Sequence, residues 1–213
     1  RDMILAKGTG ARLNICHIST KGSVELVRDA KRRGQRVWAE VAPHHFTLND
    51  KLVSIDNTNT KMNPPLRGEE DVESIIEGLK DGTIDIIATD HAPHHEGEKN
   101  LSYEQAAFGI VGLETSIALG ISELVMKDIL TPLELIEKMT INPARMLGVD
   151  KGSLKVGGTA DITIIDPNTE YEIDINEFES KSKNSPFHRR RVKGKALYTI
   201  VDGKIILDNG RLI

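Results

Sequence analysis

The sequence has one cysteine, few aromatic residues and no long apolar run, and each shortage excludes a class of protein. A single cysteine, Cys16, in 213 residues rules out an intrachain disulfide framework and is typical of a reducing cytoplasm. No apolar run approaches the roughly 18 residues of a membrane-spanning helix, and no secretory signal is visible, so we expect a cytoplasmic protein. Hydrophobic residues make up 38% of the chain and aromatic residues 4%, which is enough for a packed core, though not a rich one.

The chain also lacks a strong excess of one charge. It has 28 basic and 32 acidic residues, and this net charge of −4 gives no reason to expect nucleic acid or an anionic membrane as a partner. We interpret the basic run HRRRVK at residues 188–193 as a solvated strand edge, where such charges discourage further strand pairing. The chain does not begin with methionine, and residues 1–7 resemble the middle of a helix, so we expect a further segment before them.

Strand and helix patterns alternate through the first half of the chain. Apolar runs that end in polar residues indicate strands, whereas apolar residues at helical spacing that stop at a glycine indicate helices. Residues 61–66 contain two prolines and should be short and extended. This rhythm predicts an α/β fold of parallel units, either a barrel or a doubly wound sheet. The expected strands are 11–18, 37–42 and 84–91, and the expected helices are 22–33 and 69–80.

The second half of the chain changes character twice. Residues 96–102 are polar and predict a loop, and helices are expected at 113–126, 132–140 and a short stretch ending at Gly148. From Gly152 the composition favours strands, with Asp202-Gly203 marking a hairpin turn. We therefore expect a boundary that separates residues 1–150 from a β domain at residues 151–213. The expected strands of this domain are 160–165, 170–175, 196–201 and 204–208.

Polar residues that suit metal binding stand where the expected strands end. Asp90 and His91 close the apolar run at 84–91, and His17 closes an earlier one. Because the carboxyl ends of parallel strands meet at one edge, these side chains should share a pocket that suits zinc or a similar ion. No CxxC or HExxH pattern is present, so the fold would have to assemble the ligands. The alternatives are that Asp90 caps a turn and that His17 is a hydrogen-bonded core histidine.

Four motifs in order make the chain recognisable. They are ICHIST at 15–20, EVAPHH at 40–45, KMNPPLR at 61–67 and ATDHAPH at 88–94. With these motifs the chain closely resembles the bacterial class I dihydroorotases of the amidohydrolase superfamily, over about the second half of that family's usual length. Three further motifs, GGTAD at 157–161, SPF at 185–187 and TIVDG at 199–203, resemble the same family's β domain.

The resemblance implies a fold and an activity. The fold would be the carboxyl-terminal part of a distorted TIM (β/α) barrel at residues 1–150, followed by a small β-sandwich-type domain at 151–213. The complete enzyme would use one or two zinc ions to interconvert N-carbamoyl-L-aspartate and L-dihydroorotate reversibly in pyrimidine biosynthesis. The resemblance also implies a homodimer that can associate with aspartate carbamoyltransferase.

The resemblance further implies roles for single residues. His17 would be a ligand of one zinc ion, and Asp90 would be both a ligand of the other ion and the catalytic acid and base. Glu40 matches a position that binds an additional metal in some animal relatives, a role that we do not assign here. His44, His45 and His91 are expected to support the site or the structure. The implied substrate-binding residues are Asn63, His94, Phe108 and Gly109.

One part of the family pattern is missing. Relatives have a His-x-His motif, a bridging carboxylate and a further histidine in their amino-terminal half, and these 213 residues contain no His-x-His. We therefore expect the chain to be inactive by itself. A hydantoinase or allantoinase would share the strand-end ligands, but the KMNPPLR motif favours a dihydroorotase. A non-catalytic dihydroorotase-like subunit that supports aspartate carbamoyltransferase is the other alternative, and retention of His17 and Asp90 argues against it.

Overall fold

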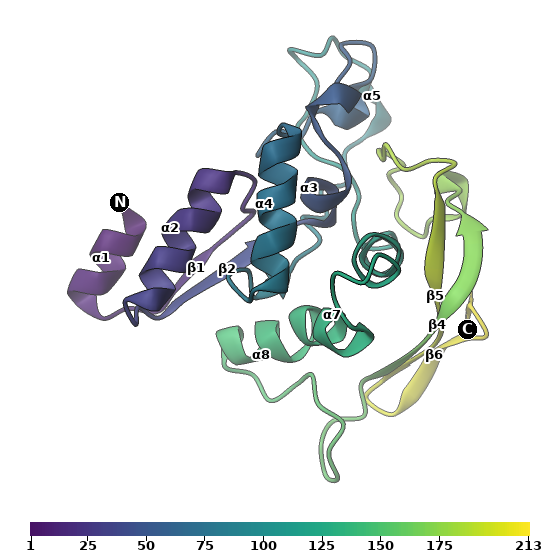
Figure 1. The fold of residues 1–213 in the computed structure, drawn as a ribbon. Helices are drawn as coiled ribbons and strands as arrows, with labels where there is room; N and C mark the ends of the chain where they lie inside the picture. Colours follow the sequence, from purple (N-terminus) through teal and green to yellow (C-terminus); the bar gives the residue numbers. More distant parts are fainter. The chain divides into compact units, whose positions relative to one another are not determined.

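The computed structural model describes residues 1–213 and contains a three-stranded parallel sheet (Figure 1). The strands are β1 (Leu13–Ile15), β2 (Val37–Val41) and β3 (Ile86–Ile87), in the order β1-β2-β3. All three expected strands are present, but the first and third are shorter than expected. His17 and Asp90 have φ angles of 54° and 47°, and a left-handed residue cannot continue a strand. The α/β class is as predicted.

Helices α2 (Lys21–Arg32) and α4 (Glu69–Lys80) pack side by side next to this sheet (Figure 1). The Thr20 hydroxyl accepts from the amide of Ser23 and so caps α2. A Cβ on Gly78 of α4 would lie 3.0 Å from Val24 of α2, so the absent side chain allows the two helices to approach closely. The other helices here are α1 (Asp2–Thr9), α3 (Pro43–Thr47), η1 (Asp50–Leu52), η2 (Thr58–Thr60) and α5 (Glu96–Lys99).

Helix α5 corrects one prediction, because residues 96–99 were expected in a loop. The His95 ring accepts from the amide of Gly97, and the Glu98 carboxylate accepts from the amide of His95. These two bonds make a reciprocal capping box. The sequence pattern concealed the helix because histidine is not among the residues usually favoured at this position.

A four-stranded antiparallel sheet contains the remaining strands, in the order β4-β5-β6-β7. Two expected strands, 160–165 and 170–175, form the single strand β4, whose pairing with β5 is irregular between Asp166 and Glu170. Asp202 and Gly203 have φ angles of 48° and 76°, so the predicted hairpin turn is confirmed. The bounds are β4 (Ile162–Glu172), β5 (Arg191–Val201), β6 (Lys204–Asp208) and β7 (Arg211–Leu212).

Four helical segments lie between α5 and the first strand of this sheet. The expected helix 113–126 is instead α6 followed by a π-helical segment, η3. The later helix α8 ends, as predicted, at Gly148, which has a φ of 74°. The η4 turn (Ile175–Glu177) follows β4. The bounds are α6 (Ser116–Gly120), η3 (Ile121–Val125), α7 (Pro132–Met139) and α8 (Ile141–Leu147).

The chain forms two compact units. The first comprises Arg1–Ser116 together with Asp174–His188, and the second comprises Ile117–Ile173 together with Arg189–Ile213. Residues 174–188 therefore belong to the unit that contains the parallel sheet, although they come late in the sequence. The division at residue 150, expected from composition, stays a prediction. None of the helices combines the length and apolar character needed to cross a membrane.

Candidate active site

His17 and Asp90 lie together at one edge of the parallel sheet. His17 follows β1 and Asp90 follows β3, on either side of the central strand β2. The Nε2 atom of His17 is 3.7 Å from Oδ1 of Asp90, and both side chains are partly exposed. Their left-handed backbone is uncommon for residues other than glycine, and such conformations cluster at functional sites. The structure thus brings these two residues together, whereas their roles stay a prediction.

Glu40 of β2 lies beside this pair. Its Oε1 atom is 3.5 Å from Nδ1 of His17, and its Oε2 atom accepts a hydrogen bond of 2.9 Å from the Asn14 amide. The Glu40 side chain is largely buried, so its charge acts strongly on its neighbours. Burial raises the pKa of Asp90, the negative charge of Glu40 raises it further, and His17 opposes both effects. The sequence signal for Glu40 is an acidic residue inside an apolar strand.

The donor atoms of this cluster fit a metal ion in part. A histidine nitrogen and a carboxylate oxygen are both zinc donor atoms, and a separation of 3.7 Å is short enough for them to bind adjacent ions of a pair. The buried Nδ1 atom of His17 has no hydrogen-bond partner within the chain. However, a catalytic zinc usually has three protein ligands, and no group of three or more His, Cys, Asp or Glu in the chain is placed to hold an ion. The 213 residues therefore supply an incomplete ligand set.

Three other histidines surround the pair and have structural contacts. His44 and His45 are buried in α3 with ring centroids 4.3 Å apart, and burial lowers the pKa of both, that of His45 to about 4. Both are therefore neutral at pH 7. The Nδ1 atom of His91 accepts from the amides of Gly112 and Leu113 at 3.1 and 3.3 Å, which ties the loop after β3 to the segment at 112–113.

Three of the four expected substrate-binding residues contact one another. The Nε2 atom of His94 donates a 2.8 Å hydrogen bond to the carbonyl of Phe108, whose side chain is 56% exposed. Gly109 has a φ of 115°, and a Cβ there would lie 2.5 Å from the side chain of Ala92, so this position requires glycine. Asn63 is exposed, and its side chain makes no hydrogen bond to the other three.

Backbone hydrogen bonds connect these residues to the strand-end pair. The amide of Ala92, two residues after Asp90, donates to the carbonyl of Ile110 at 2.9 Å. The amide of Gly109 donates to the carbonyl of Lys61 at 3.0 Å, and Lys61 is two residues before Asn63. The three loops that carry the expected site residues are therefore joined, although His17 makes no direct hydrogen bond to any of the four substrate-binding candidates.

Asn184 is a site residue that sequence reasoning missed. Its side-chain amide donates to the carbonyls of Ala92 and Gly109 at 2.9 and 3.1 Å, and its carbonyl oxygen accepts from the amide of His94 at 3.4 Å. Asn184 is buried and comes from the segment that returns late in the chain. Its only sequence signal is its place directly before the SPF motif.

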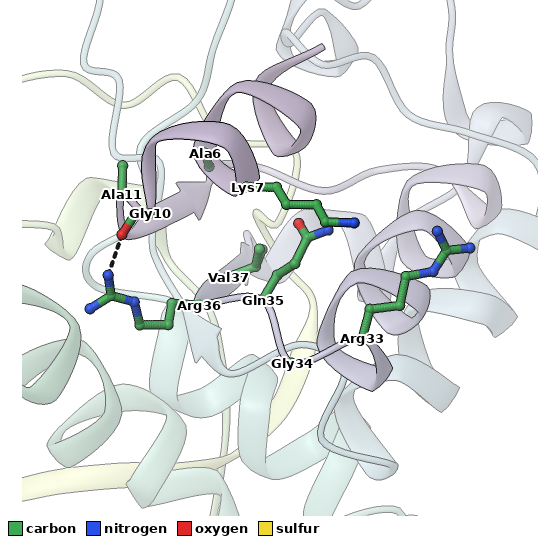
Figure 2. A pocket seen from close by; sticks show the side chains of 9 residues that line it. All are labelled: Ala6, Lys7, Gly10, Ala11, Arg33, Gly34, Gln35, Arg36 and Val37. Carbon is green, nitrogen blue, oxygen red and sulfur yellow. Dashed lines mark hydrogen bonds between the residues drawn. The ribbon is translucent and has the colours of Figure 1, made fainter.

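A pocket elsewhere in the same unit does not suit this chemistry. The pocket, whose lining residues Figure 2 shows, lies where β2 begins. His17 and Asp90 instead follow the carboxyl ends of β1 and β3. Its charged side chains are Lys7, Arg33 and Arg36, and Arg36 donates to the carbonyl of Gly10. The pocket is lined by no histidine or carboxylate, so it has neither the usual zinc ligands nor an imidazole or carboxylate base.

A family model described as the amidohydrolase family matches residues 11–206, and the chain belongs to that family. It is 55% identical over 209 residues to the dihydroorotase of Pelotomaculum thermopropionicum, and 56% identical over 205 residues to the dihydroorotase of a Thermoanaerobacter species. These alignments cover 98% and 96% of this chain but 49% and 47% of the relatives. The chain thus spans about half the length of the curated relatives that it matches.

Two solved structures have a fold closely similar to that of this chain. The L-hydantoinase (dihydropyrimidinase) from Arthrobacter aurescens matches with a TM-score of 0.94 and 31% identity, over 100% of this chain and 48% of that one. A D-hydantoinase (dihydropyrimidinase) from a Thermus species matches with a TM-score of 0.91 and 23% identity, over 99% of this chain and 48% of that one. The second match supports the fold alone.

Proposed function

We propose that the chain is part of a dihydroorotase, which interconverts N-carbamoyl-L-aspartate and L-dihydroorotate. The observation that carries this proposal is the 55% identity to a dihydroorotase over nearly the whole chain. The proximity of His17 and Asp90 is what such an enzyme would need at this edge of the sheet. Because the chain spans about half of its relatives, the activity belongs to a longer polypeptide, and residues 1–213 alone should be inactive.

The architecture that we propose for the complete protein is a distorted (β/α) barrel. The strands β1, β2 and β3 would be three of its parallel strands, and the sheet β4-β5-β6-β7 would belong to a small β-sandwich-type domain. The hydantoinase similarity supports this view, since active sites of such barrels lie at the carboxyl ends of the strands. His17 and Asp90 occupy that end. A homodimer and an association with aspartate carbamoyltransferase remain part of the proposal.

We infer that His17 and Asp90 bind zinc in the complete polypeptide. The remaining ligands would come from the segment that corresponds to the half of the relatives that this chain does not span. A bound zinc ion would supply Lewis-acid polarisation of the substrate carbonyl and a lower pKa for water. The carboxylate of Asp90 would accept a proton from the attacking water and return it to the leaving ring nitrogen. The negative charge of Glu40, 3.5 Å from Nδ1, would attract that side of the His17 ring, which leaves Nε2 directed toward Asp90.

Substrate would lie against the loops that follow β3. Asn63 would donate a hydrogen bond to the substrate carboxylate, His94 would contact the substrate, and the exposed Phe108 ring would cover the dihydropyrimidine ring beside Gly109. The shared contacts of His94, Phe108 and Gly109 support this arrangement, because they hold the three residues in fixed relative positions.

Dihydroorotate hydrolysis by the complete polypeptide tests the proposal. Asp90→Asn should lower kcat by about 10²–10⁴-fold, the usual contribution of a general acid or base. Asp56→Asn, at an exposed aspartate, is the matched control and should leave the rate unchanged. Full activity of the Asp90→Asn variant would exclude the proposed role of Asp90.

A hydantoinase is the second candidate, and the 31% identity to the Arthrobacter aurescens L-hydantoinase is the observation that favours it. The same polypeptide should be assayed with dihydroorotate, hydantoin and allantoin. Turnover of hydantoin or allantoin without turnover of dihydroorotate would replace our proposal. Turnover of none of the three by a zinc-loaded protein would favour the non-catalytic subunit.

A further inference from the structure

The segment at residues 104–109 contains Phe108 and Gly109 but has no regular secondary structure. Such a segment usually keeps its shape through turns or through strand pairing. Here the amides of Gln105 and Ala106 close a turn onto the carbonyl of Ser102, and side chains from outside the segment donate hydrogen bonds to its carbonyl oxygens. Two of these donors are lysines whose side chains are almost completely buried, Lys61 at 6% and Lys99 at 4% exposure.

Lys61 binds the first part of the segment. Its Nζ atom donates to the carbonyls of Glu104 and Ala106 at 2.9 and 2.7 Å. The same atom lies 4.3 Å from the centroid of the Phe108 ring, which is within the range of a cation–π contact. One ammonium group therefore contacts both the backbone and the aromatic side chain of this segment.

Lys99 binds the second part. Its Nζ atom donates to the carbonyls of Ala107 and Gly109 at 2.9 and 3.1 Å. Burial lowers the pKa of Lys99 to about 8, and the positive charge of Lys61 contributes to the same effect. The two lysines together bind four carbonyl oxygens, and no carboxylate lies within ion-pair distance of either ammonium group. Carbonyl dipoles are thus their main compensation for burial.

Two residues near the strand-end pair complete the set of donors. His94 donates to the carbonyl of Phe108, and Asn184 donates to the carbonyl of Gly109. Every carbonyl from residue 106 to residue 109 consequently accepts a hydrogen bond from a side chain. Burying two lysine charges without acidic partners costs free energy, whereas apolar residues of similar size would pack here without that cost. Their donor groups account for the presence of lysines at these positions.

We propose that Lys61 and Lys99 are positioning residues that fix Phe108 and Gly109 for substrate binding. This inference rests on the proposed function, in which Phe108 and Gly109 contact substrate. Each ammonium group binds two carbonyls that lie two positions apart in the chain, and so restricts the backbone dihedrals between them. If the lysines stabilised only the fold as a whole, their loss would affect the entire unit rather than this segment.

Lys99→Met and Lys61→Met in the complete polypeptide test the proposal, because methionine keeps the side-chain length and removes the donor and the charge. Each variant should raise KM for dihydroorotate about tenfold while kcat changes less than about twofold, the pattern expected when uniform substrate binding is lost. Lys80→Met, at an exposed lysine of α4, is the matched control and should leave both constants unchanged.

Amide hydrogen exchange provides a readout that does not depend on catalysis. Exchange should become at least tenfold faster in peptides that cover residues 104–109, while peptides from α2 and α4 keep the exchange of the unmodified protein. Because both lysines hold one segment, the double variant should loosen it less than the sum of the two single effects.

The outcomes separate this inference from the proposed function. Uniform loosening of the whole unit, or unchanged exchange at 104–109, would overturn the positioning role. Faster exchange confined to 104–109 in a polypeptide that does not hydrolyse dihydroorotate would support the effect of the lysines on the segment and refute the proposed activity. If one variant fails to fold, the other tests the same segment independently.

Discussion

The Nε2 atom of His17 lies 3.7 Å from Oδ1 of Asp90, although the two residues follow different strands that do not pair with each other. The central strand β2 separates β1 from β3, and the residues meet beyond its end. Both residues have left-handed backbones and lie just beyond the ends of β1 and β3.

His17→Ala should reduce the zinc content of the complete polypeptide, because a nitrogen ligand is lost. The expected result is about one zinc ion fewer per chain, since His17 and Asp90 are proposed to bind different members of a pair. Metal analysis of purified protein by mass spectrometry checks this. His188→Ala, at an exposed histidine, serves as the control, and equal zinc in all three proteins would contradict the assignment of His17.

Glu40→Gln should weaken zinc binding by about 10–100-fold, the usual effect of losing a carboxylate that orients a ligand histidine. Glutamine has the same shape but no negative charge to attract Nδ1 of His17. Competition with a chelator measures the affinity, and Glu73→Gln, at an exposed glutamate of α4, is the control. An unchanged affinity would mean that Glu40 does not orient His17.

Gly112→Ala should destabilise the protein by about 1–3 kcal/mol, the usual cost of overpacking, or more. A Cβ at residue 112 would lie 2.3 Å from the carbonyl oxygen of Thr89, which belongs to the backbone and cannot rotate away. At Gly22, in the first turn of α2, no atom lies within 4 Å of a Cβ, so Gly22→Ala should be neutral or slightly stabilising. Urea unfolding of both variants compares them, and equal stability would show that the loop after β3 can move.

Glu123→Gln should destabilise the second unit near neutral pH by about 1–2 kcal/mol, a value between those of exposed and buried ion pairs. Glu123 pairs with Arg190 at 2.5 Å and with Lys127 at 2.6 Å. Burial raises the pKa of Glu123, but the hydrogen bonds and charges of Lys127 and Arg190 lower it by more, so the net pKa lies below its ordinary value.

The sign of the pH dependence follows from that lowered pKa. The unfolded chain binds a proton at Glu123 before the folded chain does, so the stabilisation is fully present above the ordinary glutamate pKa and disappears as pH falls through the folded value. Unfolding in urea at pH 7 and at pH 3 should therefore show a smaller difference between Glu123→Gln and the unmodified protein at the lower pH. Glu137→Gln, at an exposed glutamate, is the control. A difference that grows on acidification would contradict the ion-pair explanation.

Sequence patterns predicted correctly those helices and turns that depend on residues close together in the chain. Helix α4 begins and ends at the expected residues, and the Asp202-Gly203 turn has the expected conformation, because spacing and backbone preference act over a few residues. The helix at 96–99 was missed because a histidine ring serves as its cap. The expected helix 113–126 was only partly right, because its regular hydrogen bonding changes to a π-helical segment at η3.

The sequence by itself determined the α/β pattern and the motifs shared with the amidohydrolase family. It also pointed to His17 and Asp90, since polar residues that follow apolar strands can be recognised from the order of residues alone. Only the tertiary structure decided that Glu40 faces His17, that Lys61 and Lys99 bind one loop, and that Asn184 joins two loops. These contacts join residues far apart in the chain and follow no periodic pattern. The hydrogen bonds of an irregular segment can be assigned only when the folded chain brings its donors within reach.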